Sequence, residues 1–232
     1  MAIKSILFNT KMVRAILDGR KTCTRRICKD ANEYTVPDMD FYNADKRTYA
    51  VHNFIDREHT EQLSTVERTC SICPGDILYV RETWCALPVN EAGHMRGHSI
   101  YYYRADGDLR PEGWRGKWRP SIHMPKEAAR IWLKVTDVRV ERLQEITEDE
   151  TFEEGLDFTP PCLHLTGENY CDIDGPCTSE IKYCDMSYGE LFGEVLWNNT
   201  IKKSDLDRYG WTANPWVWVI EFERCERKEV TL

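Results

Sequence analysis

Hydrophobic residues occur in short runs that are separated by longer polar segments. Several runs alternate apolar and polar positions, which is typical of β-strands with one buried face. This pattern predicts strands at 3–8, 77–84, 100–104, 129–143 and 215–224. In the last of these, Trp216, Trp218, Ile220 and Phe222 would share one face, and we expect both tryptophans in the core.

Three segments have the pattern of short helices. In the first, Asn9 or Thr10 can cap the N-terminus, Met12, Ala15 and Ile16 form an apolar stripe, and Gly19 stands at the end. The second runs from the capping box Thr147-Glu-Asp-Glu to Gly155, and the third is an amphipathic helix over 188–199. Residues 29–69 have weak periodicity and predict an excursion from the core with a hairpin.

The 129–143 strand changes its apolar parity near Thr136-Asp137, which indicates a β-bulge or a sharp bend. Bends of this kind are needed to close a small barrel. The pattern as a whole therefore predicts an α+β fold, in which a small β-barrel carries flanking short helices and large loop insertions.

Charge limits the partners that this chain can bind. The 232 residues carry a net charge of −8, which argues against broad binding to duplex nucleic acid. Cations nevertheless gather locally, because residues 11–29 hold seven lysines and arginines against one acid, Asp18. No apolar run is long enough for a membrane helix, and the N-terminus lacks a signal-peptide core, so we expect no membrane partner and a cytoplasmic protein.

The sequence "GRKTCTRR" at 19–26 is the centre of this cationic cluster. One interpretation is a binding or reactive site. The other is an ordinary helix end, since cations near a helix C-terminus interact well with its dipole. If 22–27 is extended, Thr22, Thr24 and Arg26 share one face.

The spacing Gly19-x-Lys21-x-x-Thr24-x-Arg26 resembles the signature of the ASCH family. Further similar parts are the Pro74-Gly75-Asp76 turn, the Glu154-Gly155 helix end and the closing strand "VIEFE". The resemblance covers 3–28, 74–84, 129–156 and 214–224, and the longer strings "VRETW" and "NPWVWVIEFE" are similar to a phage or prophage branch. It implies one PUA-like domain over 1–232, with insertions at about 29–69, 85–120 and 157–212.

The resemblance also implies a function, namely binding of RNA or of a modified nucleoside or nucleobase. Some ASCH proteins are amidohydrolases that deacetylate N4-acetylcytidine, and by this resemblance Lys21, Thr24 and Glu154 would be catalytic. Glu153 is the alternative acid. A threonine hydroxyl needs a base before it can attack, and a lysine can serve if its surroundings lower its pKa. A third hypothesis is a phage accessory protein in the host cytoplasm whose insertions bind a host protein.

Candidate ligand-binding residues are those of the cationic segment and the aromatic segments: Gly19, Arg26, Arg81, Trp84 and Trp118. Exposed aromatic rings beside arginines suit single-stranded RNA or a nucleobase. The alternative is that Trp84 packs in the core at a strand end and that Trp118 covers one end of the barrel.

Ten cysteines are many for a protein without a secretory signal, and they favour free thiols or metal ligands over disulfides. Cys162, Cys171, Cys177 and Cys184 lie in a loop-like segment, where four thiolates could hold a structural zinc ion. Their spacing differs from standard zinc fingers, so free thiols remain the alternative. Cys70-x-x-Cys73 is a single knuckle. We expect no cofactor to be required.

Overall fold

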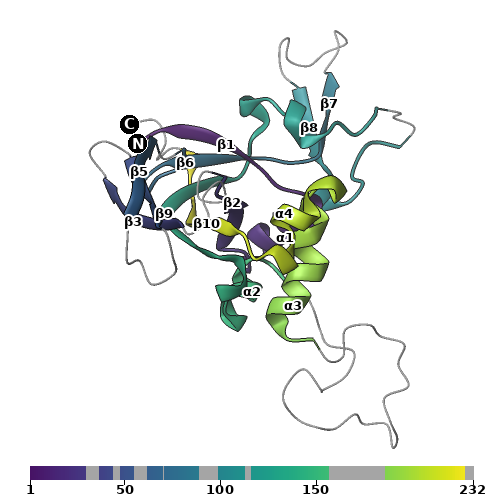
Figure 1. Cartoon of the computed structure of the whole chain (residues 1–232). Helices are drawn as coiled ribbons and strands as arrows, with labels where there is room; N and C mark the ends of the chain where they lie inside the picture. Colours follow the sequence, from purple (N-terminus) through teal and green to yellow (C-terminus); the bar gives the residue numbers. More distant parts are fainter. Residues whose placement is uncertain are drawn as a thin grey trace, which may run out of the picture. The chain divides into compact units, whose positions relative to one another are not determined.

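A computed structural model of the chain describes residues 1–29, 37–43, 48–54, 62–69, 71–88, 99–112, 116–156 and 186–227 (Figure 1). The chain divides into two compact units. The first unit comprises Met1–Thr22, Ile72–Val138 and Ile220–Leu232, and the second comprises Cys23–Ser71 and Arg139–Val219. The proposal of one domain with three insertions stays a prediction.

The largest sheet has five strands in the order β1-β6-β9-β10-β2. Their bounds are β1 Ile3–Leu7, β6 Ile77–Arg81, β9 Trp132–Arg142, β10 Trp216–Cys225 and β2 Cys23–Ile27. Strand β1 pairs in parallel with β6, and β6 pairs antiparallel with β9. The fold is therefore mixed α/β on a mostly sheet core, as expected, but no sheet among the described residues closes into a barrel.

Helix α1 (Thr10–Leu17) in the first unit has both of the ends that its sequence predicts. The Asn9 side chain accepts the Met12 N–H at 2.9 Å. At the other end, Gly19 adopts φ +78°, its N–H binds the Ile16 carbonyl, and the Arg20 N–H binds that of Ala15. This pair of bonds is a Schellman motif, which needs a left-handed residue and so favours glycine.

The described residues of the first unit also form a hairpin and three single turns of 3-10 helix. The hairpin strands are β7 Trp84–Pro88 and β8 Ser99–Tyr103, and the turns are η2 Arg104–Asp106, η3 Ser121–His123 and η4 Lys126–Ala128 (Figure 1). Trp84, Met124, Ala129 and Trp132 pack with Ile77 in its core. The predicted 77–84 strand is wrong at its end, because β6 stops at Arg81 and a new strand begins at Trp84.

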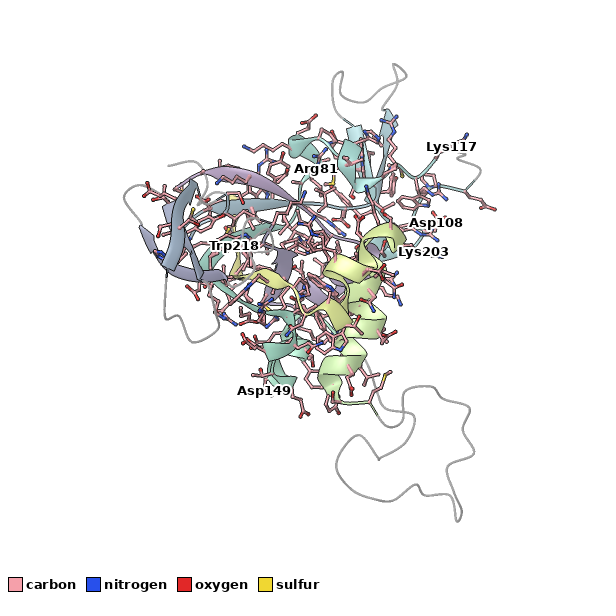
Figure 2. All side chains as sticks on the ribbon, in the orientation of Figure 1. Arg81, Asp108, Lys117, Asp149, Lys203 and Trp218 are labelled. Atoms are coloured by element: carbon pink, nitrogen blue, oxygen red, sulfur yellow. The ribbon has the colours of Figure 1, made fainter. Side chains whose placement is uncertain are left out.

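The second unit holds a three-stranded antiparallel sheet of β3 Pro37–Asn43, β4 Thr48–Phe54 and β5 Gln62–Thr69. The weakly periodic 29–69 segment therefore forms three strands where a hairpin was predicted. The ring of Trp218, which is labelled in Figure 2, meets the Tyr49 ring of β4 edge-on, at 4.7 Å between centroids.

Helices of the second unit surround a core that includes Leu143, Phe192, Trp197, Val217 and Val219. Their bounds are η5 Leu143–Glu145, α2 Glu148–Glu153, α3 Tyr188–Leu191, η7 Phe192–Trp197, η8 Asn198–Thr200, η9 Lys203–Asp205, α4 Leu206–Tyr209 and η10 Trp211–Ala213. The predicted helix over 188–199 is thus α-helical only at its start, since η7 is a π-helix.

The core face that the sequence predicts for strand β10 (Trp216–Cys225) is wrong at its two tryptophans. Val217 and Val219 are fully buried, whereas Trp216 and Trp218 are only half-buried. Val219 and Ile220 are buried in succession, so the buried parity changes within the strand. The Arg142 guanidinium lies over the Trp216 ring, 4.4 Å from the ring centroid. Among the described helices, none is long and apolar enough to cross a membrane.

Candidate functional site

The cationic segment passes from the end of α1 into strand β2. After the Schellman motif, the Lys21 N–H also binds the Ala15 carbonyl at 3.0 Å. Lys21 is only 2% exposed, and its Nζ lies 5.5 Å from the Phe8 ring centroid in the first unit. Neighbouring Thr22 is exposed. A lysine this deeply buried differs from the solvated cations of an ordinary helix end.

Thr24 is the second residue of β2 and is completely buried. Its hydroxyl finds no hydrogen-bond partner within the part of the chain that the structure describes. Buried hydroxyls in proteins are nearly always hydrogen-bonded, since an unsatisfied one costs about 1–3 kcal/mol. Thr24 is therefore an exception that the packing of the second unit does not explain.

Glu154 caps the C-terminus of helix α2, and the following Gly155 adopts φ +87°. The Gly155 N–H binds the Phe152 carbonyl, and the Leu156 N–H binds that of Thr151, which forms a second Schellman motif. This turn leaves Glu154 3% exposed, whereas Glu153 is exposed. The two acids that the sequence offers as alternatives therefore differ in burial.

The Glu154 carboxylate joins the helix end to the cationic segment. Its Oε1 accepts the Arg25 backbone N–H at 2.5 Å and lies 3.6 Å from the Arg25 guanidinium. The bond links residues 129 positions apart in sequence. Glu154 is thereby fixed beside the residue that follows Thr24.

Arg25 is 2% exposed and lies at the centre of an ion-pair network. Its guanidinium donates to Glu141 at 2.5 and 3.1 Å and to Glu150 at 3.0 Å. Arg139 donates to the same two carboxylates. Three acids and two arginines therefore neutralise most of one another's charge, as buried ions require.

The network changes the pKa of its members. Burial works against the charged guanidinium, but Glu154 and Glu141 outweigh it and raise the pKa of Arg25. Burial also opposes ionisation of Glu150, yet the Thr147 N–H and the arginines lower its pKa overall. Both groups thus stay charged over the ordinary pH range.

Arg26, a predicted ligand-binding residue, is half-buried in the second unit. Its guanidinium donates to the Arg25 carbonyl at 3.1 Å. Loss of hydration lowers the pKa of Arg26, and the charge of Glu154 offsets part of this effect.

Sequence reasoning missed the network around Arg25. Arg25, Arg139 and Glu141 are not among the residues predicted for the site, and Glu150 is predicted only as the acid of the Thr147 capping box. One signal was present: Arg139 and Glu141 are two residues apart on a strand, so they share a face. An alternating Arg and Glu on one strand face is typical of an ion-pair network.

The other predicted ligand-binding residues belong to the first unit. The Arg81 guanidinium donates to the Met124 carbonyl at 2.9 Å and to that of Ile122, which holds the following loop. Trp84 is 4% exposed within the core cluster, in agreement with the packing interpretation. Trp118 is half-buried, and its ring lies under the Arg104 and Arg110 guanidinium groups.

A second charged cluster in the first unit is structural. Arg130 makes bonds of 2.7–3.1 Å with buried Glu82 and with Asp106, and its guanidinium covers the Tyr103 ring. Burial raises the pKa of Glu82, and Arg130 offsets part of this effect. Arg130, Glu82 and Asp106 all take part in ion pairs, so the cluster stabilises the hairpin.

The predicted zinc ligands Cys162, Cys171, Cys177 and Cys184 lie outside the described residues, as does Cys70. Cys73 is buried. Among the described residues, no group of three potential ligands could hold a metal ion. The structural zinc site therefore stays a prediction.

Comparisons with models of protein families, with characterised proteins and with solved structures found no match to this chain.

Proposed function

We propose that the chain binds RNA or one of its nucleosides or nucleobases, modified or not, through the segment Gly19–Arg26. The observation that carries the proposal is the Thr24 hydroxyl, which is completely buried and has no hydrogen-bond partner among the described residues. A group kept unsatisfied at a cost of about 1–3 kcal/mol is well suited to a ligand that satisfies it.

A nucleobase edge is a suitable partner for this hydroxyl. Threonine can both donate and accept a hydrogen bond, and base edges carry donors and acceptors side by side. The cations of the segment favour ligands with carbonyl oxygens or phosphate groups. The net charge of −8 favours a compact ligand over a long duplex.

The contact between two parts of the ASCH-like signature supports an ASCH-type site. The Lys-Thr-Arg segment and the Glu-Gly turn lie far apart in sequence, yet the Arg25 N–H binds Glu154. We propose on this basis that the five-stranded sheet is part of an ASCH domain with a PUA-like barrel.

The test is a calorimetric titration with cytidine, N4-acetylcytidine and the other ribonucleosides. We expect saturable binding to the wild type and at least about a tenfold loss in Thr24→Val, because one hydrogen bond is removed. Thr22→Val is the matched control, since Thr22 is exposed and directly precedes strand β2, and this variant should bind as the wild type. Equal binding by both variants contradicts the proposal.

Hydrolysis of an acylated base is the second candidate function. The observation that favours it is the burial of Lys21, Thr24 and Glu154, which are 2%, 0% and 3% exposed. In this reaction the Thr24 hydroxyl attacks the acyl carbon and gives its proton to a base, the role that the ASCH resemblance assigns to Lys21 in its neutral form. The carbon–nitrogen bond breaks, the amine leaves with a proton relayed by Glu154, and water hydrolyses the acyl-threonine ester.

Acetate release from N4-acetylcytidine distinguishes the two functions. Turnover that is lost in Thr24→Val and in Lys21→Ala supports the enzyme. Binding without acetate release supports a binding module only.

A further inference from the structure

We propose that a second nucleic-acid interface lies in the first unit, where Arg104, Lys117 and Arg119 bind the phosphate backbone of a single-stranded RNA. The inference rests on the proposed function only for the choice of RNA among anionic partners. Its position follows from independent contacts around Trp84 and Trp118.

Among the described residues, the three cations have few oppositely charged partners. Lys117 and Arg119 are exposed, and neither has an ion pair within the described ranges. Figure 2 shows the Lys117 side chain extending outward from the chain. The Arg104 side chain is 49% exposed and has only a loose pair with Asp108 at 3.9 Å. Charges of this kind remain available to an anionic partner.

Arg110 next to them has a different role. Its guanidinium donates to both Asp108 oxygens and to the Gly116 carbonyl, each at 2.6 Å. It also covers the Trp118 ring at 4.7 Å from the centroid. Arg110 is therefore a brace of the loop, and we do not count it in the interface.

Two of the three cations are anchored at neighbouring residues. Arg119 forms a reciprocal pair of backbone bonds with Trp84, at 2.7 and 3.2 Å, and its guanidinium stacks 5.2 Å from the Trp84 ring centroid. The Arg104 N–H binds the Thr83 carbonyl at 2.9 Å, and its guanidinium lies 5.4 Å from the Trp118 centroid. Residues 83 and 84 thus hold both arginines on one part of the hairpin.

The tryptophans contribute their ring faces to this arrangement. Both indole N–H groups are buried and have no acceptor among the described residues, while both rings carry guanidinium groups. Stacking fixes the orientation of an arginine but leaves N–H groups at its edge, which match phosphate oxygens. Because these arginines are already oriented, binding orders fewer side chains and loses less entropy.

A single-stranded RNA fits this surface better than an acidic protein segment. Its bases can stack on the outer faces of the arginines while its phosphates meet the cations. Three cations correspond to a short stretch of backbone, so the contact is small and strongly dependent on salt.

The experiment measures binding of a fluorescein-labelled oligouridylate of about 12 nucleotides by anisotropy, at salt concentrations between about 50 and 200 mM. We expect Lys117→Ala and Arg119→Ala each to weaken binding about three- to tenfold and to reduce the logarithmic salt slope by about 0.7. The triple variant with Arg104→Ala should lose binding further. Arg208→Ala is the matched control, since Arg208 is exposed and lies 5.0 Å from the Tyr209 ring.

Two outcomes overturn the inference. One is a triple variant that binds the oligonucleotide as well as the wild type. The other is a wild type that prefers poly-glutamate, which would identify an acidic protein as the partner. Nucleoside titrations separate this result from the proposed function, because the triple variant should keep nucleoside binding and Thr24→Val should lose it.

Discussion

The carboxylate of Glu154 accepts the backbone N–H of Arg25 at 2.5 Å, which fixes the end of helix α2 against strand β2. This bond satisfies a buried backbone donor and a buried carboxylate at once. It also brings into contact two parts of the ASCH-like signature that lie 129 positions apart in sequence. The charge of Glu154 is therefore structural as well as a candidate for chemistry.

Replacing Glu154 should destabilise the fold. In Glu154→Gln the amide oxygen can still accept the Arg25 N–H, but the ionic component is lost, and we expect a cost of about 1–3 kcal/mol in unfolding free energy. Urea denaturation measures it. Glu153→Gln provides the control, because Glu153 is exposed and its replacement should change stability by less than about 0.5 kcal/mol.

Removing the Thr24 hydroxyl should leave stability unchanged or raise it. Thr24→Val keeps the shape of the side chain and removes a buried group that has no described partner. Thr151 is equally buried, but its hydroxyl donates to the Glu148 carbonyl at 2.6 Å. Thr151→Val should therefore cost about 1 kcal/mol. Equal losses in the two variants, measured by thermal denaturation, would show that Thr24 has a structural partner after all.

The loss of unfolding free energy at acidic pH should depend on Glu150. Its pKa is lowered because the Thr147 N–H, Arg25 and Arg139 outweigh burial. A carboxyl with a depressed pKa stabilises the fold above its unfolded value of about 4.3, and this contribution disappears as the pH falls through the folded value.

We therefore expect the stability difference between the wild type and Glu150→Gln to be largest near about pH 6–7 and to shrink below about pH 5. Denaturant titrations across this range measure the difference. Glu148→Gln, which changes an exposed acid in the same helix, should show no comparable trend. A difference between wild type and Glu150→Gln that is constant with pH would contradict the assignment.

The packing of the π-helix against Trp211 should be sensitive to a single methyl group. A Cβ atom on Gly193 would lie 2.3 Å from Trp211 ring atoms, so we expect Gly193→Ala to cost at least about 1–3 kcal/mol. On Gly189 it would lie 3.4 Å from that ring, and Gly189→Ala should be tolerated or stabilising by up to about 1 kcal/mol. Parallel melting curves of the two variants test this contrast.

Local signals predicted much of the fold and part of the site. The Asn9 cap, the Gly19 turn and the Thr147 capping box depend on residues within a few positions, and the structure confirms them. The barrel, the ASCH relationship and the roles of Lys21, Thr24 and Glu154 stay predictions.

The errors arose where distant packing decides. The alternation in "PWVWVIEFE" was read from the larger side chains, so the tryptophans were placed in the core, while Val217 and Val219 fill it. Similarly, the apolar pattern over 188–199 predicts a helix but does not show that part of it is a π-helix. Nor does the pattern show that the Trp211 ring packs against Gly193 within that π-helix.

The sequence by itself determined the short elements, their caps and the cationic segment, because these depend on backbone preferences and on neighbours along the chain. Only the tertiary structure decided which polar groups are buried together. Glu154 is buried whereas Glu153 is exposed, and Arg25, which the sequence did not single out, lies at the centre of three carboxylates. The physical reason is that desolvation and ion pairing depend on contacts between residues more than one hundred positions apart, which no local pattern records.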